Sequence, residues 1–234
     1  MRKIVFDRLK NVSLLTLVLF MAAVLACVIA AVHGVQSDWM LATFTPCLGS
    51  LADNITQDCD NPRVSGYETT ALIINRDDID WSSITVDSSN PRIVKTLALN
   101  SGTGIKPYVI YNPRVNPASF NGTKTEYSSD NDRYTKTLQF YFEGIGGGAS
   151  KDVVEPLKSG SYLVILQRKD HRGDGSFQII GYQSGLVASD EVQDEDTGYW
   201  LITMNTTEPS AEIAFFNTDY ATTKAAFDTL LAQA

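Results

Sequence analysis

The chain has 234 residues, enough for one domain with a substantial core, and its 44% hydrophobic and 20% charged content is typical of a folded protein rather than a disordered one. Its net charge of −8 is uneven, because the first 39 residues hold four basic and two acidic side chains and the rest hold 15 basic against 25 acidic ones, a net charge of −10. Nucleic-acid binders concentrate Lys and Arg on one face, so this acidic body argues against tight or sequence-specific nucleic-acid binding.

An uncharged apolar run occupies residues 12–32, behind the basic stretch RKIVFDRLK. A bilayer core needs about 20 apolar residues, so this run predicts a hydrophobic helix that can span a membrane. Three interpretations stay open: a signal anchor, a cleaved signal peptide, and an upstream start codon with Met40 as the true first residue. Lipidation of Cys27 is disfavoured, because Leu25 stands where a small residue is usual and the apolar run continues.

Residues 40–68 are rich in turn formers, such as Asp60-Asn61-Pro62. We expect an irregular arm here, between the N-terminal segment 1–39 and a β-rich domain at 69–234. Cys47 and Cys59 lie in this arm without a second pair, so their spacing does not fit a zinc site. If the chain is exported, the two cysteines can form a disulfide, whereas in the cytoplasm they would remain thiols. We favour thiols, because export is only one of the interpretations of the N-terminal segment.

Ten short runs of β-branched and aromatic residues follow, separated by Gly, Pro, Asn and Asp. They are residues 69–75, 83–87, 92–99, 106–111, 133–142, 161–169, 177–182, 185–189, 198–205 and 212–216. Their spacing predicts a mainly β fold, a β-sandwich or barrel. Residues 133–142 alternate and place one apolar face on Tyr134, Leu138, Phe140 and Phe142. Residues 163–166 are continuously apolar, which is typical of a central strand covered on both faces.

Two helices are expected among these strands. Residues 150–158 predict a short middle helix with Ser150 as its N-cap and with Pro156 limiting its regularity. Residues 218–233 predict a C-terminal helix that covers a sheet, with Thr218 as the candidate cap. Its apolar face consists of Tyr220, Thr223, Phe227, Leu230 and Leu231.

No constellation of residues marks a catalytic, cofactor-binding or metal site, so we expect no enzyme. The sequence has two histidines, of which His33 lies beside the apolar run and His171 in a loop, and neither supports a catalytic triad. Residues 144–151, GIGGGASK, lack the Gly-Lys-Ser/Thr order of a phosphate loop and predict a flexible connector before the middle helix.

Two further motifs have ordinary explanations. The acidic residues Asp190, Glu191, Asp194, Glu195 and Asp196 lack the spacing of an EF-hand, so we expect a solvated hairpin loop. Arg172-Gly173-Asp174 matches a tripeptide of some adhesion ligands, but it lies in a predicted hairpin loop in which glycines are common turn residues.

The sequence resembles virion proteins of phages and prophages of gut bacteria, of the tail-tube (major tail protein) type. The resemblance covers residues 60–231 and is carried by CDNPRVSG (59–66), ALIINRDDID (71–80), GSFQIIGYQSGLVAS (175–189), GYWLITM (198–204) and FFNTDYATTKAAFDTLL (215–231). It implies a non-enzymatic structural subunit that forms rings or stacks with itself and with other tail proteins. The hydrophobic N-terminus departs from the pattern of that family.

The leading hypothesis is therefore a self-assembling tail subunit, found in the virion and assembled in the host cytoplasm. The alternative is an exported or membrane-anchored surface protein, held through residues 12–32, with a β-sandwich binding domain. Exposed sheet edges can join subunits, and neither residues 133–142 nor residues 161–169 contain a proline that would blunt an edge. We expect a ring-forming homo-oligomer that pairs through such edges.

Overall fold

The computed structural model describes residues 51, 54–55, 59–113, 118–144, 146–196 and 198–234. The chain divides into two compact units, residues 1–58 and residues 59–234, and every element below belongs to the second. The expected hydrophobic helix at 12–32, Met40 and Cys47 lie outside the described residues, so the predictions made for them stay predictions. Within the described part, no helix is long and apolar enough to cross a membrane.

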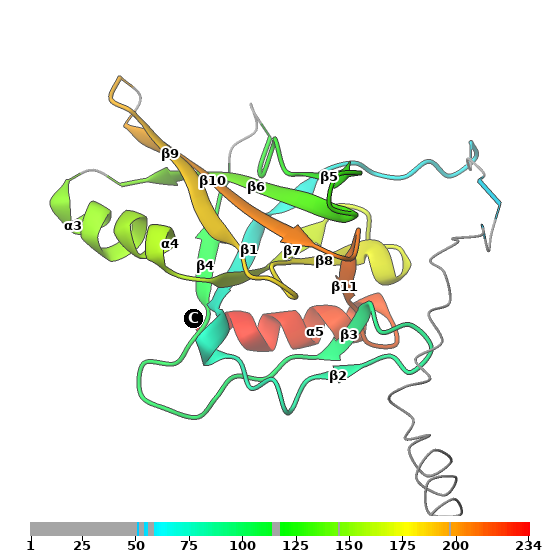
Figure 1. Cartoon of the computed structure of the whole chain (residues 1–234). Coiled ribbons are helices and arrows are strands. Elements are labelled where there is room, and N and C mark those ends of the chain that lie inside the picture. The colour runs from blue at the N-terminus through cyan, green and yellow to red at the C-terminus, as the bar shows by residue number, and fades with distance from the viewer. Residues whose placement is uncertain (1–50, 52–53, 56–58, 114–117, 145, 197) are drawn as a thin grey trace, which may run out of the picture. The chain divides into compact units, whose positions relative to one another are not determined.

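Residues 59–234 are mainly β and form two sheets, as the spacing of short apolar runs predicts (Figure 1). The larger sheet has seven strands in the order β2-β3-β11-β8-β7-β1-β4. These strands are β1 (Tyr67–Asn75), β2 (Thr85–Val86), β3 (Ile93–Thr96), β4 (Tyr108–Tyr111), β7 (Tyr162–Arg168), β8 (Phe177–Ile180) and β11 (Ile213–Phe215). Neighbouring strands are antiparallel, except that β3 and β11 are parallel.

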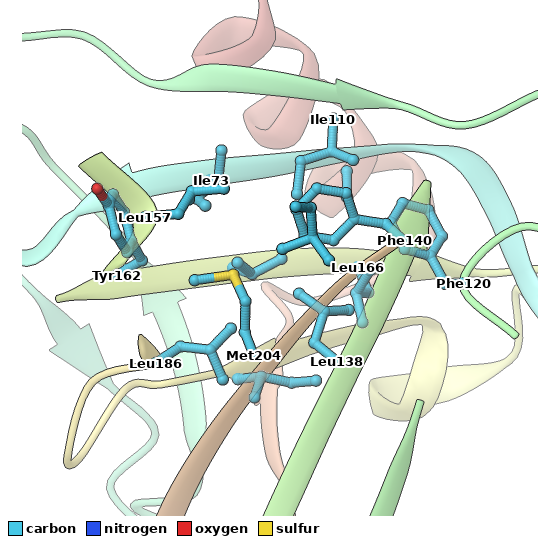
Figure 2. Packing of buried hydrophobic residues seen from close by; sticks show 14 residues of the cluster. Ile73, Ile110, Phe120, Leu138, Phe140, Leu157, Tyr162, Leu166, Leu186 and Met204 are labelled. Carbon is cyan, nitrogen blue, oxygen red and sulfur yellow. The ribbon is translucent and has the colours of Figure 1, made fainter. Parts of the chain in front are cut away.

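The smaller sheet has four antiparallel strands in the order β5-β6-β10-β9. They are β5 (Lys124–Ser128), β6 (Arg133–Glu143), β9 (Val187–Asp194) and β10 (Tyr199–Glu208). Side chains of β6 and β10 alternate, and their apolar faces turn toward the larger sheet. One apolar cluster therefore contains side chains of both sheets, including Ile73, Ile110, Leu138, Phe140, Leu166 and Met204 (Figure 2).

Strand β7 confirms the interpretation of the continuous apolar run. Val164 and Leu166 belong to the cluster between the sheets, whereas Leu163 and Ile165 belong to a second cluster on the opposite face. All four side chains are fully buried. The position of β7 inside the larger sheet, between β8 and β1, explains why no polar residue interrupts the run.

Helix α5 (Tyr220–Leu231) covers this second cluster, as expected for the C-terminal helix (Figure 1). Phe227 is 1% exposed, and its ring lies 5.3 Å from that of Phe177, centroid to centroid. The predicted cap was wrong by one residue: the carboxylate of Asp219, rather than Thr218, accepts a hydrogen bond of 2.7 Å from the backbone N–H of Thr222. Thr218 instead has a φ of 64°, in the left-handed region, where the chain turns into the helix.

The predicted short middle helix is present and begins earlier than expected, at Gly147. It runs through α3 (Gly147–Ala149), a π-helical turn (Ser150–Val154) and α4 (Glu155–Ser159). Pro156 has no backbone N–H and cannot complete a regular α-helical pattern, which accounts for the wider turn before it. Buried Val154 and Leu157 hold the helix against the fold.

Three strand predictions need correction. Strand β5 was missed because its residues, KTEYS, are nearly all exposed and carry no apolar alternation. Strand β9 was predicted to end at residue 189 but continues to Asp194, so much of the expected acidic loop is strand. The segments 133–142 and 161–169 correspond to β6 and β7, which are interior strands, so neither provides the exposed edge for which they were considered.

A fully buried ion pair links β6 and β10 on the inner face of the smaller sheet. Lys136 shares its face with Leu138 and Phe140, and its Nζ lies 2.5 Å from Oε2 of Glu208, with both side chains 0% exposed. The other carboxylate oxygen of Glu208 accepts a 2.8 Å hydrogen bond from the backbone N–H of Gln183. A buried charge without its partner is very costly, so each of these residues depends on the other.

We predict that Lys136→Met lowers the free energy of unfolding by about 3–5 kcal/mol, because it leaves the Glu208 carboxylate buried without a counter-charge. The double variant Lys136→Met/Glu208→Leu should recover most of that loss. Lys124→Met, which breaks the exposed pair with Glu126, is the matched control and should cost under about 1 kcal/mol. Urea denaturation of the three variants measures these differences, and a double variant no more stable than Lys136→Met would contradict the interpretation.

Candidate functional site

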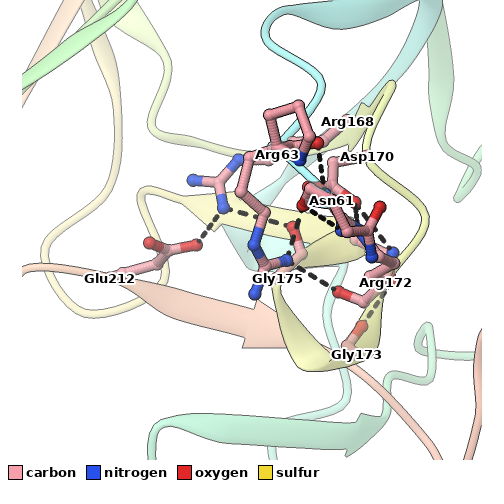
Figure 3. Close-up of polar contacts among 10 residues, drawn as sticks. Asn61, Arg63, Arg168, Asp170, Arg172, Gly173, Gly175 and Glu212 are labelled. Carbon is pink, nitrogen blue, oxygen red and sulfur yellow. Dashed lines mark hydrogen bonds and ion pairs between the residues drawn. The ribbon is translucent and has the colours of Figure 1, made fainter. Parts of the chain in front are cut away.

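A cleft of about 500 Å³ opens where β7, the 3-10 turn η3 (Gly173–Ser176), β11 and the segment before β3 meet. We call it the arginine cleft, because three arginines from distant parts of the chain line it. The charged residues around it are Arg63, Arg92, Arg168, Asp170, Asp174 and Glu212. Figure 3 shows how several of these side chains converge.

Arg168, the last residue of β7, lies at the base of the arginine cleft and is firmly held. Its guanidinium donates to the carbonyl oxygen of Gly175 at 3.1 Å and to Oε1 of Gln178 at 3.2 Å. It also pairs with Oε1 of Glu212 at 2.8 Å. Burial opposes the charge, but the hydrogen bond and the charge of Glu212 outweigh burial and raise the pKa of Arg168. Arg168 therefore stays charged, and the carboxylate of Glu212 balances its charge.

Arg172 and Asp170 form the second held pair, in the loop between β7 and η3. Nε of Arg172 lies 2.8 Å from Oδ1 of Asp170, and its Nη2 lies 3.0 Å from Oδ2, a two-pronged contact. The same guanidinium donates to the carbonyl oxygens of Asn61 and Pro62, each at 2.9 Å (Figure 3). Arg172 thus fastens the segment before β1 to this loop, so the Arg-Gly-Asp tripeptide has a structural role.

Two guanidinium groups remain available at the arginine cleft. Nη1 of Arg63 makes two long contacts, with Oδ2 of Asp170 and with the carbonyl oxygen of Arg172, each at 3.4 Å, and its side chain is 73% exposed. Arg92 is exposed as well, and its guanidinium makes no hydrogen bond or ion pair within the described part of the chain. Chemically, the cleft can accept a carboxylate or another small anion, since guanidinium groups match such oxygens in a two-pronged geometry.

Of the charged residues around the cleft, the sequence singled out only Asp174, as part of the Arg-Gly-Asp tripeptide, and it predicted no site there. Arg63, Arg92 and Arg168 are separated by more than 25 residues from one another, and no local motif joins them. Arg63 lies within the stretch CDNPRVSG (59–66), and nothing in that stretch indicates the role of its arginine. Only the topology, which places β3 beside β11 and β8 beside β7, brings the three together.

Apart from the Arg-Gly-Asp tripeptide, the residues singled out from the sequence lie outside the lining of the cleft. The ring of His171 stacks on Tyr220 at 4.4 Å, centroid to centroid, and its Nε2 lies 3.3 Å from Oε1 of Glu68. Gly147 and Gly148 of the glycine-rich stretch begin the middle helix. Glu191 pairs with Lys158 at 2.9 Å. Cys59 is exposed, and the expectation that Cys47 and Cys59 are thiols rather than a disulfide stays a prediction, because Cys47 lies outside the described residues. The described residues contain no group of three potential metal ligands.

The four edges of the two sheets differ in how well they are protected. Natural edge strands are kept from pairing by shortness, charge or bulges. Strand β2 has two residues, β5 carries the Lys124–Glu126 pair, and β9 is acidic with a register shift against β10. Strand β4 has none of these features: its sequence is YVIY, and Tyr108, Val109 and Tyr111 are 45%, 44% and 65% exposed.

We predict that the Asp170 carboxyl titrates well below the usual aspartate range, because the Arg172 hydrogen bonds lower its pKa. A lowered pKa stabilises the fold above the unfolded value of about 3.9, and this stabilisation is lost as the pH falls through the folded pKa. Carboxyl ¹³C chemical shifts recorded against pH measure the titration. Arg172→Gln should move the midpoint up toward the usual range, whereas the exposed Arg133→Gln should leave it unchanged. An unshifted Asp170 in the wild-type chain would refute the assignment.

Comparison with known proteins identifies no relative of this chain. No family model matches the chain, and neither a curated protein nor a solved structure matches it. The unprotected β4 edge and the arginine cleft are therefore the two features from which a function can be inferred.

Proposed function

We propose that this chain is a non-enzymatic structural subunit that assembles with itself into a phage or prophage tail, as a tube-like ring or stack. The observation that carries the proposal is the edge strand β4. No described strand pairs with its outer side, it contains no charge or proline, and large apolar side chains stand exposed along it. Such an edge is ready to pair with a strand of another chain.

The architecture supports this proposal. We infer that the two sheets, which share one apolar cluster, form a β-sandwich rather than a barrel, so their edges stay open. Pairing of β4 with β4 of a second copy is a two-fold contact that gives dimers, so a ring or stack also needs a second, head-to-tail contact between subunits. The acidic body would keep DNA from adhering to a tail lumen, and the resemblance to tail-tube proteins points the same way.

The alternative proposal is an exported or membrane-anchored surface protein with a binding domain. The arginine cleft favours it, because its volume of about 500 Å³ lies within the range of small-ligand sites and two guanidinium groups face it. Residues 12–32 would then hold the domain at a membrane. In the leading proposal the protein resides in the virion after assembly in the host cytoplasm.

The test of the leading proposal is Val109→Lys/Tyr111→Lys, which places two charges on the exposed side of β4. We expect the full chain, purified in mild detergent to accommodate residues 12–32, to form rings or short stacks at high concentration. The variant should form no rings or stacks, because paired β4 edges would bring like charges together. Negative-stain microscopy and sedimentation velocity distinguish these states.

The matched control is Val86→Lys on β2, at the opposite edge of the same sheet, where Val86 is 42% exposed. It should assemble like the wild-type chain. All three proteins should melt at similar temperatures, since none of the altered side chains is buried. A wild-type chain that remains monomeric at every concentration would overturn the assembly proposal and favour the surface-binding alternative.

A further inference from the structure

The turn between β9 and β10 carries three consecutive carboxylates, Asp194, Glu195 and Asp196. Asp194 closes this turn, with its Oδ1 accepting a 3.1 Å hydrogen bond from the backbone N–H of Asp196. The next two side chains, Glu195 and Asp196, are exposed and make no ion pair within the residues that the structure describes. We call Asp194–Asp196 the acidic turn. Figure 1 shows the β9–β10 hairpin, in orange, projecting beyond the sheets.

The arginine cleft has the complementary charge. With Arg168 paired to Glu212 and Arg172 paired to Asp170, the remaining charges are the guanidinium groups of Arg63 and Arg92 and the carboxylate of Asp174. The charged residues that line the cleft balance, three arginines against three carboxylates, and Arg172, which pairs with the lining residue Asp170, adds one positive charge in excess. The whole chain, by contrast, has a net charge of −8. Most of the surface of this protein repels a second copy, so a positively charged cleft is an unusual point of attraction on it.

The acidic turn cannot reach the cleft of its own chain. In Figure 1 the tip of the hairpin lies at one end of the β-rich unit, whereas the turn η3, in yellow beside β8 and β11, lies toward the other end. A contact between the two must therefore join different molecules. Because the acidic turn and the cleft are different surfaces, that contact is head to tail, the arrangement that builds rings and stacks.

We propose that the arginine cleft binds the acidic turn of a second copy of this chain, with Glu195 and Asp196 facing Arg63 and Arg92. The inference rests on the proposed function, since it names a second contact between assembling subunits. Carboxylates and guanidinium groups form charge-assisted hydrogen bonds, and one face of the cleft is open to receive them. The β4 edge joins subunits through uncharged strand pairing, whereas the contact of cleft and turn determines which two surfaces of neighbouring subunits meet.

A charge-swap experiment on the full chain tests the contact. The cleft-reversed variant is Arg63→Glu/Arg92→Glu, and the turn-reversed variant is Glu195→Lys/Asp196→Lys. All four side chains are exposed, so both variants should fold, which circular dichroism checks. Each variant alone should associate at least roughly tenfold more weakly than the wild type in sedimentation velocity at low ionic strength. An equimolar mixture should recover association, because each cleft then meets a turn of opposite charge.

The matched control is Arg133→Glu/Lys151→Glu, which makes the same change in net charge at exposed positions away from the cleft. It should associate more strongly than the cleft-reversed variant. Association of both reversed variants at the wild-type level, or a mixture that recovers nothing, would overturn the inference.

Comparison with Val109→Lys/Tyr111→Lys separates the two proposals. If the β4 variant is monomeric while the cleft-reversed variant assembles normally, the contact is wrong and the assembly proposal stands. If the charge swap recovers association while the β4 variant assembles like the wild type, the cleft contact stands and the β4 edge is not the assembly surface. A wild-type chain that never associates overturns both.

Discussion

The fold depends on one strand pair that must be apolar on both of its faces. Residues 163–166 of β7 and 71–74 of β1 are all buried, and alternate side chains enter opposite clusters. Fully burying one such aliphatic side chain contributes about 1.5–3 kcal/mol, and these two strands serve both clusters at once. The smaller sheet closes one cluster and α5 closes the other, so both depend on the double-faced centre of the larger sheet.

Because the centre of the larger sheet is apolar on both faces, most polar and charged side chains lie at the edges and ends of the β-rich unit. The interior ion pair of Lys136 and Glu208 joins two opposite charges that are both 0% exposed and therefore out of reach of a ligand. Arg168 and Arg172 are likewise engaged, one at the end of β7 and the other in the following loop. The groups that can contact another molecule lie at the β4 edge, at the rim of the arginine cleft and on the acidic turn.

The protected and unprotected edges have a common explanation. A two-sheet protein leaves four edges, and pairing at every one of them would lead to uncontrolled aggregation. Here β2 is short, β5 is charged and β9 is acidic, which leaves β4 as the one described edge without such a device. A single open edge limits edge pairing to two subunits, and the proposed contact of turn and cleft would join such pairs to further copies. This asymmetry of the edges is the observation that supports the assembly proposal.

The sequence by itself determined those elements whose buried side chains recur with the period of a strand or a helix. The continuous apolar run at 163–166 identified the central strand, the alternation around Leu138 and Phe140 identified an inward face, and residues 218–233 identified the covering helix. Where side chains are exposed the pattern is lost: β5 was missed, and β9 was ended too early at residue 189. The predicted cap was Thr218 and the observed cap is Asp219. Both residue types can cap a helix, and only the path of the backbone selects between them.

Only the tertiary structure decided which partners meet. Lys136 could be read as a charge on an apolar face, but its partner Glu208 lies 72 residues away and becomes a neighbour through the pairing of β6 with β10. The arginine cleft arises in the same way, since its three arginines come from separate segments. Strand order also decides which strands form edges, and it placed β4 there while enclosing β6 and β7. Contacts between distant residues leave no period in the sequence, because they depend on sheet order rather than on spacing along the chain.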